Sequence, residues 1–207
     1  MNKKTIITIG RQYGSGGHEI GRRLAEKLGV PFYDRELLTM AAKSSGMSEE
    51  VFENYDEKPT NSLLYSLSMG TYAMGNVGSA YMNLPINHKV FLAQFDTIKE
   101  IAEKGGCVIV GRCADYALQQ YPHLVNVFIH ADIKKRVRRI MDRHQLTSKE
   151  AEELIIKTDK KRNNYYNFYT NKKWSAVDSY HLAVDSGVIG IDKAVQLIAD
   201  FADIKEP

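Results

Sequence analysis

The chain has 207 residues, of which 43% are hydrophobic, and a formal net charge of +3 at pH 7. This length suits one main domain around a sizeable core, and the low net charge excludes a polycation built for nucleic acid. The two cysteines lack the paired spacing of a disulfide-stapled module, and the apolar N-terminal stretch is too short for a signal peptide or a membrane span. We therefore expect one cytoplasmic domain with no membrane attachment.

The first elements along the chain alternate between strand and helix. β-branched residues at positions 6–9 end at a glycine and predict a short buried strand. Apolar residues at helical spacing predict a helix over residues 18–28, and residues 30–33 predict a second strand that stops at Asp34. The order strand, loop, helix, strand predicts a parallel sheet.

The rest of the chain continues this alternation after a less regular middle. Residues 62–85 mix Leu, Tyr, Met, Gly and Ser without a clean period. We interpret them either as a flap or a homo-oligomer surface, or as a loop packed on the body. Further helices are expected at residues 35–44, from Ser48, and at 90–102, 133–144, 148–161 and 191–201, and further strands at 107–110, 125–129 and 181–184. The expected fold class is α/β.

A glycine-rich loop joins the first strand to the first helix, and its sequence is Gly-Arg-Gln-Tyr-Gly-Ser-Gly-Gly-His-Glu. Glycine lets successive backbone N–H groups aim at one anion, and the start of the following helix adds partial positive charge. A plain connector is the alternative, but the flanking strand and helix favour a cradle for nucleotide phosphates. The residues of this cradle would be Gly10, Tyr13, Gly14, Ser15, Gly16, Gly17, His18 and Glu19.

The loop departs from the Walker A pattern at two positions. Gly17 stands where that pattern has lysine, and His18 stands where it has serine or threonine. Other residues must then bring positive charge to the transferring phosphate, and other oxygens must organise magnesium. The candidates for the charge are Arg11, Arg22, Arg23 and the basic segment described below. The candidates for the metal are Ser15, His18, Glu19 and Asp34.

Charged residues also follow two of the predicted strands. Arg112 comes after a buried strand and a glycine, so its guanidinium is expected at the carboxyl edge of the sheet, where open α/β sheets bind ligands. A salt bridge to Asp115 is the alternative. Asp34 ends a strand at the same edge, and it would hold metal or acceptor unless it caps the next helix.

A basic segment follows the fourth predicted strand. Its charges are Lys134, Lys135, Arg136, Arg138, Arg139 and Arg143, followed by Lys157, Lys160, Lys161 and Arg162. A solvated helix surface is one interpretation of such a cluster. Contact with an RNA or DNA backbone is another, with Tyr165, Tyr166, Phe168, Tyr169 and Trp174 stacking on bases.

Taken together, these motifs resemble the cytidylate kinase-like proteins, which are related to nucleoside monophosphate kinases. The matching stretches are residues 8–21, Pro31-Phe32-Tyr33-Asp34, Gly111-Arg112-Cys113-Ala114-Asp115, and Asp159-Lys160-Lys161-Arg162 with Tyr165-Tyr166. A Gly-Ser-Gly-Gly loop is typical of this branch, and residues 45–87 match least. The resemblance implies a three-layer α/β/α P-loop kinase fold in a single domain over residues 1–207, with a mostly helical acceptor-side insert at 45–88 and a basic lid region at 133–175.

The resemblance also implies an activity, which is transfer of a phosphoryl group from ATP, with Mg²⁺, to a nucleoside monophosphate such as CMP. Arginines would neutralise the charge on the transferring phosphate. The implied catalytic residues are Arg11, Arg112, Arg136, Arg139 and Arg162. The implied acceptor-binding residues are Asp34, Arg35, Arg112, Asp115, Asp159 and Lys160, and the implied metal ligands are Ser15 and Asp34.

Two other functions remain open at this point. A nucleotide-binding sensor would bind ATP without turnover, having lost phosphoryl transfer along with the loop lysine. A small-molecule kinase would use the same donor cradle with a non-nucleotide acceptor, for which the poorly matching insert leaves room. The histidines lack the spacing of zinc ligands, and Ser15 lacks the frame of a hydrolase nucleophile.

Overall fold

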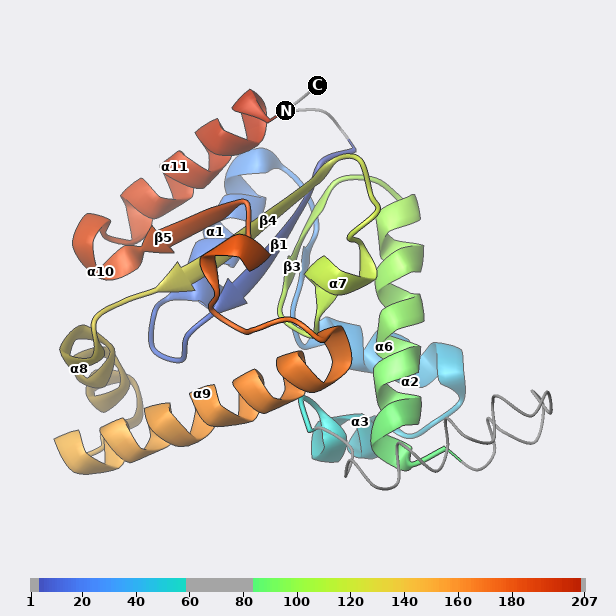
Figure 1. Cartoon of the computed structure of the whole chain (residues 1–207), viewed down its shortest axis with the longest axis horizontal. Coiled ribbons are helices and arrows are strands. Elements are labelled where there is room, and N and C mark those ends of the chain that lie inside the picture. The colour runs from blue at the N-terminus through green and yellow to red at the C-terminus, as the bar shows by residue number, and fades with distance from the viewer. Residues whose placement is uncertain (1–3, 59–83, 206–207) are drawn as a thin grey trace.

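A five-stranded parallel sheet forms the centre of the protein. The computed structural model describes residues 4–58 and 84–205. The strands are β1 (Ile6–Arg11), β2 (Phe32–Tyr33), β3 (Cys107–Val110), β4 (Leu124–His130) and β5 (Leu182–Asp185). They lie in the order β2-β3-β1-β4-β5, and each neighbouring pair is parallel (Figure 1). The predicted α/β class with a parallel sheet is confirmed.

Helices cover both faces of this sheet, with α1 and α11 on one side and α2, α6 and α7 on the other (Figure 1). The helices are α1 (Gly17–Leu28), α2 (Glu36–Ser45), α3 (Glu49–Tyr55), α6 (Ile86–Glu103), α7 (Ala114–Ala117), α8 (Ile133–His144), α9 (Ser148–Thr170), α10 (Ser186–Ile189) and α11 (Ile191–Ile204), with a 3₁₀ turn at Val177–Ser179. Within residues 4–58 and 84–205, none of them has the length and apolar character needed to cross a membrane.

The core consists of two layers that share the sheet. Ile7 and Ile9 of β1 pack toward α1 and α11, where they meet Ile20 and Ile198. Ile6 of β1 belongs to the opposite layer, formed with α2, α6 and α7. Successive side chains of a strand point to opposite faces, so a strand covered on both faces must be apolar throughout. This explains the continuous β-branched run at the start of the chain.

The strand order brings three loops to one edge of the sheet. Tyr33 of β2 pairs with Ile109 of β3, and Val110 of β3 pairs with Ile9 of β1. The residues that follow these strands therefore come out side by side, as expected at the carboxyl ends of parallel strands. Figure 1 shows α9 running across this edge of the sheet.

Several elements differ in extent from the sequence expectations. Strand β2 has only two residues, and α9 continues to Thr170 instead of ending near residue 161. The helix continues because its last turns bury Tyr165, Tyr166 and Tyr169 against neighbouring elements. The short helices α7 and α10 were not expected. Most of residues 62–85, the predicted flap or homo-oligomer surface, lies outside the described residues.

Candidate active site

A cleft of about 730 Å³ lies at the carboxyl edge of the sheet. It brings together segments that are far apart in the sequence, namely the glycine loop, the ends of β2 and β3, the end of α3, and helices α8 and α9. The predicted site residues that line it are Arg11, Tyr13, Gly14, Gly16, Gly17, His18, Glu19, Asp34, Arg35, Arg112, Arg139 and Arg162. The predicted residues that do not line it are Gly10, Ser15, Asp115, Arg136, Asp159 and Lys160.

The glycine loop turns tightly around Ser15. The hydroxyl of this buried residue donates to the Gln12 carbonyl oxygen at 2.8 Å, and its N–H donates to the same oxygen at 3.3 Å. Gly14 and Gly16, on either side, have φ angles of 77° and 84°, which glycine adopts without steric cost. Because the Ser15 hydroxyl points into the loop, it is not directed toward a metal ion in the cleft.

The backbone amides of the loop divide into two groups. The N–H of Tyr13 donates to Asp159 Oδ1 at 2.7 Å, so it is already occupied by a carboxylate. The amides of Gly14, Gly16, Gly17 and His18 have no hydrogen-bond partner within residues 4–58 and 84–205. Such N–H groups at the start of a helix readily donate hydrogen bonds to a bound anion. Of the expected cradle, the amide of Tyr13 is therefore occupied, and those of Gly14, Gly16, Gly17 and His18 are available to an anion.

Arg11 occupies the space beside Gly17. A Cβ atom at position 17 would lie 2.5 Å from the Cβ of Arg11, which is too close for any side chain. The Arg11 side chain also runs over Gly111, and its guanidinium reaches the cleft. A lysine, like any other side chain, therefore has no room at position 17 unless the backbone shifts, and Arg11 brings a positive charge to the same part of the site.

Arg112 is held by two carboxylates at the ends of β2 and α3. Its Nη1 donates to Asp34 Oδ1 at 2.9 Å, and its Nε donates to Asp56 Oδ1 at 3.0 Å, while its side chain is only 3% exposed. Burial acts to raise the pKa of Asp34, but Arg11 and Arg112 outweigh it and hold that pKa below its usual value. The sequence alternative of an Arg112–Asp115 salt bridge is replaced by these two pairs.

Glu57 forms the centre of a second charged group. Its carboxylate lies 3.1 Å from Arg11 Nη1 and 3.5 Å from Arg162 Nε, with its side chain 11% exposed. Burial would raise the pKa of Glu57, but Arg11, Arg162 and Arg112 outweigh it and lower that pKa strongly. The carboxylate is therefore ionised at neutral pH, although it is buried.

The basic helices α8 and α9 lie against the glycine loop. Arg139 Nη1 donates to the Gly14 carbonyl at 2.9 Å, and Arg136 Nη1 donates to the Tyr13 carbonyl at 3.3 Å and to Asp159 Oδ2 at 2.6 Å. Arg162 Nη1 donates to the Arg11 carbonyl at 3.2 Å, so three arginines of α8 and α9 contact the loop directly.

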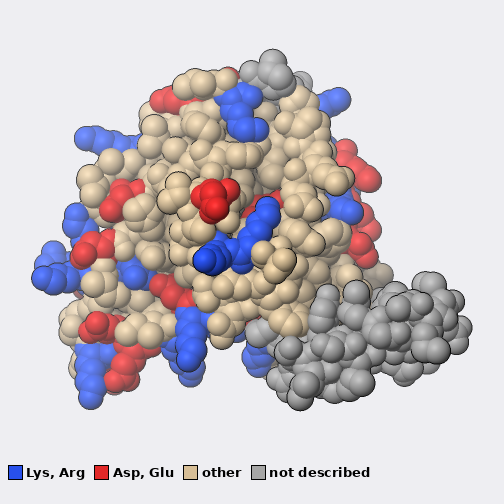
Figure 2. Space-filling model, viewed as in Figure 1, with Lys and Arg blue, Asp and Glu red and all other residues tan. Residues whose placement is uncertain are grey.

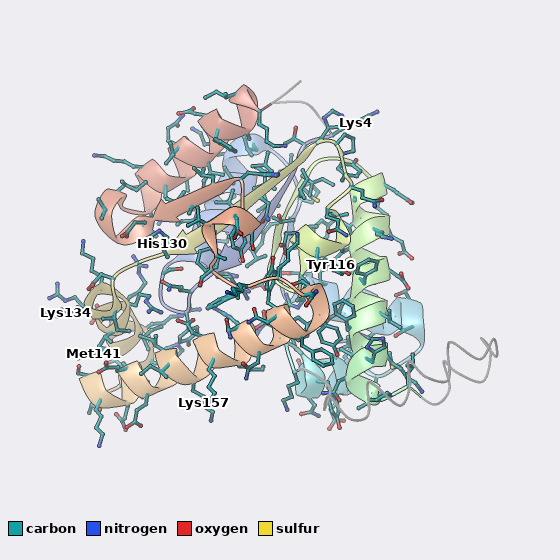
Figure 3. All side chains as sticks on the ribbon, viewed as in Figure 1. Lys4, Tyr116, His130, Lys134, Met141 and Lys157 are labelled. Atoms are coloured by element: carbon teal, nitrogen blue, oxygen red, sulfur yellow. The ribbon has the colours of Figure 1, made fainter. Side chains whose placement is uncertain are left out.

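Most of the other lysines and arginines of these helices are exposed, whereas Arg162 lines the cleft. Figure 3 shows Lys134 and Lys157 on the outer sides of α8 and α9, and Lys160 is also exposed. In Figure 2, Lys and Arg are interspersed with Asp and Glu over this face, so the surface here is of mixed charge.

Asp115 lies in a buried polar cluster outside the cleft. It accepts a hydrogen bond of 2.6 Å from the Tyr166 hydroxyl, and Asn126, which contacts Thr8 at 3.1 Å, is its other polar neighbour. Burial raises the pKa of Asp115 above its usual value. Tyr165 and Tyr169 are buried as well. These tyrosines are therefore not available to stack on nucleic-acid bases.

The described residues do not form a ready magnesium site. No group of three or more His, Cys, Asp or Glu side chains suited to a metal ion occurs in the part of the chain that the structure describes. Asp34 uses one oxygen for Arg112 and the other for His18 Nδ1, at 2.7 Å. The two residues expected to bind the metal, Ser15 and Asp34, are thus engaged elsewhere.

Sequence reasoning missed Asp56 and Glu57, which pair with the arginines of the cleft. Both follow helix α3, in the stretch with the weakest family resemblance. No local pattern in the sequence marks Glu57 as buried or Asp56 as a partner of Arg112.

Comparisons with known proteins agree with this geometry. In sequence and fold, the chain is similar to an uncharacterized protein from Eubacterium ventriosum ATCC 27560, with 29% identity, a TM-score of 0.72, and coverage of 96% of this chain and 98% of that one. It has the same fold as shikimate kinase from Bacteroides thetaiotaomicron, with 16% identity, a TM-score of 0.53, and coverage of 96% and 98%. No curated protein matches the chain. The model of the cytidylate kinase-like family matches residues 6–188. Because this match spans most of its length, the chain belongs to the cytidylate kinase-like family, and its fold is that of the P-loop kinases.

Proposed function

We propose that this protein transfers the γ-phosphoryl group of ATP to a small acceptor bound in the same cleft. One observation carries the proposal: the glycine-loop amides that have no partner among the described residues line the same cleft as Arg11 and Arg162. Phosphoryl transfer asks little covalent chemistry of a protein and depends on positioning and on neutralising charge. The amides would bind the donor phosphates, and the arginines would stabilise the charge that moves between donor and acceptor.

Helices α8 and α9 would act as the lid. Arg139 already reaches the glycine loop, so a small shift of α8 would move its guanidinium from the Gly14 carbonyl to a phosphate. Covering the cleft in this way would exclude water and limit wasteful hydrolysis of ATP. The described residues offer no ready magnesium site, so in this proposal the arginines and the loop amides stabilise the charge on the phosphates.

The acceptor in this proposal is a nucleoside monophosphate, with CMP as the first choice. Membership of the cytidylate kinase-like family supports that choice. Arg35 at the start of α2 lines the cleft and is exposed, so it can receive a phosphate. Asp34 and Arg112 would position the acceptor beside it.

A non-nucleotide acceptor with hydroxyl groups is the second candidate. The observation in its favour is that Arg112 is already neutralised by Asp34 and Asp56. A carboxylate accepts hydrogen bonds from hydroxyl groups and repels phosphate, so this part of the cleft also suits an uncharged polyol.

The test is to incubate the protein with ATP and Mg²⁺ and with CMP, other monophosphates or a panel of small polyols, and to measure ADP. ADP formation that depends on one acceptor supports phosphoryl transfer and identifies that acceptor. Binding of ATP in calorimetry without turnover with any acceptor would instead support a nucleotide sensor.

Arg139 provides a sharper test of the lid. Arg139→Ala is expected to lower kcat/KM by about 10²-fold, because it removes a cation that contacts the donor phosphates in the transition state. Arg138→Ala is the matched control, since Arg138 is an exposed neighbour on the same helix, and it should leave kcat/KM unchanged. Equal losses in both variants would contradict the assigned role of Arg139.

A further inference from the structure

Glu57 has a left-handed backbone conformation directly after the C-cap of α3, a position that glycine usually takes. Its φ angle is 50°, in the left-handed region that residues other than glycine rarely adopt. The residue directly follows Asp56, which ends α3, and its side chain turns inward to contact Arg11 and Arg162. A strained backbone of this kind persists only where surrounding contacts hold it in place.

The two arginines around Glu57 need an anion between them. Burial and the charge of Arg11 both lower the pKa of Arg162, while the carboxylates of Glu57 and Asp159 act in the opposite direction. Two guanidinium groups that contact the same side chain repel each other unless a negative group lies between them, and Glu57 provides that group. Without Glu57, the space between Arg11 and Arg162 would be an open anion site in the wall of the cleft.

We propose that Arg11 and Arg162 form a phosphate-binding site whose resting occupant is the Glu57 carboxylate, and that a phosphate group of the bound nucleotide displaces Glu57 when it enters. This inference rests on the proposed function, because it assumes that the ligand of the cleft carries phosphate. The pair of arginines would add a second part to the phosphate cradle formed by the loop amides. In it, Arg11 would supply the positive charge that a lysine at position 17 supplies in the Walker A pattern.

Phosphate is a stronger partner than carboxylate for this pair. It carries more negative charge and offers more acceptor oxygens, and guanidinium groups bind it with two parallel hydrogen bonds. The ion pairs of Glu57 with Arg11 and Arg162 would thus be replaced by stronger ion pairs between the arginines and the phosphate. Because Glu57 directly follows α3, phosphate binding would also move the end of that helix.

Glu57→Gln tests this exchange, with tripolyphosphate as the probe in titration calorimetry at low ionic strength. Removing the competing charge is expected to tighten binding by roughly tenfold, because like charges at close range oppose binding. Glu50→Gln is the matched control, since Glu50 is exposed on α3 and the substitution changes the net charge equally. Unchanged or weaker binding by Glu57→Gln, relative to Glu50→Gln, would overturn the proposal.

A second measurement uses the unaltered protein, so it does not depend on the folding of a variant. Hydrogen exchange is followed at residues 49–58 with and without tripolyphosphate. The N–H of Lys58 donates to the Tyr55 carbonyl at 3.2 Å in the resting state, and this turn should exchange faster once Glu57 is released. Unchanged or slower exchange in this turn at saturating tripolyphosphate would contradict the displacement.

The two proposals can fail independently. Tripolyphosphate binding requires no turnover, so tighter binding by Glu57→Gln together with faster exchange would support displacement even if no acceptor yields ADP. Conversely, ADP formation with an acceptor would support the proposed function even if Glu57→Gln did not bind tripolyphosphate more tightly and hydrogen exchange at residues 49–58 did not become faster. Those two results would contradict only the displacement of Glu57.

Discussion

At the scale of single residues, buried arginines paired with carboxylates distinguish this protein. Arg112 and Arg136 have side chains that are 3% and 9% exposed, and each contacts an aspartate. A buried ion pair adds little net stability, but the loss of one partner leaves an uncompensated charge. We therefore expect the removal of one partner of such a pair to lower the free energy of unfolding by more than the intact pair contributes.

Asp159 shows this most directly, because it accepts hydrogen bonds from both Arg136 and the Tyr13 amide. Asp159→Ala is expected to lower the free energy of unfolding by about 3 kcal/mol, since it leaves the buried charge of Arg136 without its carboxylate. The exposed neighbour provides the control, and Lys160→Ala should change the stability by less than about 0.5 kcal/mol. Urea unfolding measures both, and similar values for the two variants would refute the role given to Asp159.

The lowered pKa of Asp34 predicts how its contribution to stability depends on pH. A carboxyl whose pKa is lower in the folded state than in the unfolded state stabilises the fold above its ordinary pKa of 3.8, and this stabilisation is lost as the pH falls below that value. Asp34→Asn should therefore be less stable than the unaltered protein at pH 7, and the difference should shrink below pH 3.8. A difference that stays constant between pH 7 and pH 3 would argue against the ion pair.

At the scale of elements, α9 connects the two halves of the site. Its middle carries Asp159 and Arg162 to the glycine loop and the cleft, and its last turns pack Tyr165 and Tyr169 against α6. The helix starts with a capping box in which Thr147 and Glu150 bind each other's backbone N–H groups. Because the residues of the cleft and the packing tyrosines lie on one helix, the stability of its start affects the geometry of the cleft.

Removal of the cap tests how far the start of α9 contributes to stability. Thr147→Ala is expected to lower the Tm by about 2 to 4 °C, because it removes one of the two reciprocal bonds of the capping box. Thr147→Ser keeps the hydroxyl and should stay within about 1 °C of the unaltered protein. Thermal unfolding followed by circular dichroism measures the difference, and an equal loss in the serine variant would assign the effect to packing instead.

At the scale of the whole molecule, the two layers of the core meet at the sheet and predict cooperative unfolding as one domain. Trp174, the only tryptophan, contacts Phe128 of β4 with its ring centroid at 5.4 Å. Its fluorescence therefore reports on the region between α9 and the sheet, while far-ultraviolet circular dichroism reports on all helices.

Ile198 of α11 lies in the layer of the core formed with α1 and is fully buried. Ile198→Ala is expected to cost about 2 to 5 kcal/mol through the cavity it leaves, and to shift the fluorescence and dichroism transitions together. Leu197→Ala is the control, since Leu197 is 43% exposed on the same helix. Separate transitions would contradict the single domain over residues 1–207 that the sequence predicts.

The sequence by itself determined the alternation of strands and helices, the glycine loop and the edge of the sheet at which charged residues meet. These features are local, because β-branched runs, helical spacing and glycine act through the backbone of neighbouring residues. That is why the loop and the residues that follow β2 and β3 lie at the expected edge. It is also why boundaries such as the end of α9 were less well predicted, since tertiary packing of its tyrosines extends the helix.

Only the tertiary structure decided which charges face one another. Arg11 excludes lysine from position 17, Glu57 reaches the arginines from a distant segment, and Asp115 turns into the core rather than toward the cleft. Pairing between residues far apart in the chain depends on how the layers pack, because the strength of an ion pair is set by the distance between the charges and by their burial. No periodicity or motif in the sequence records those two quantities.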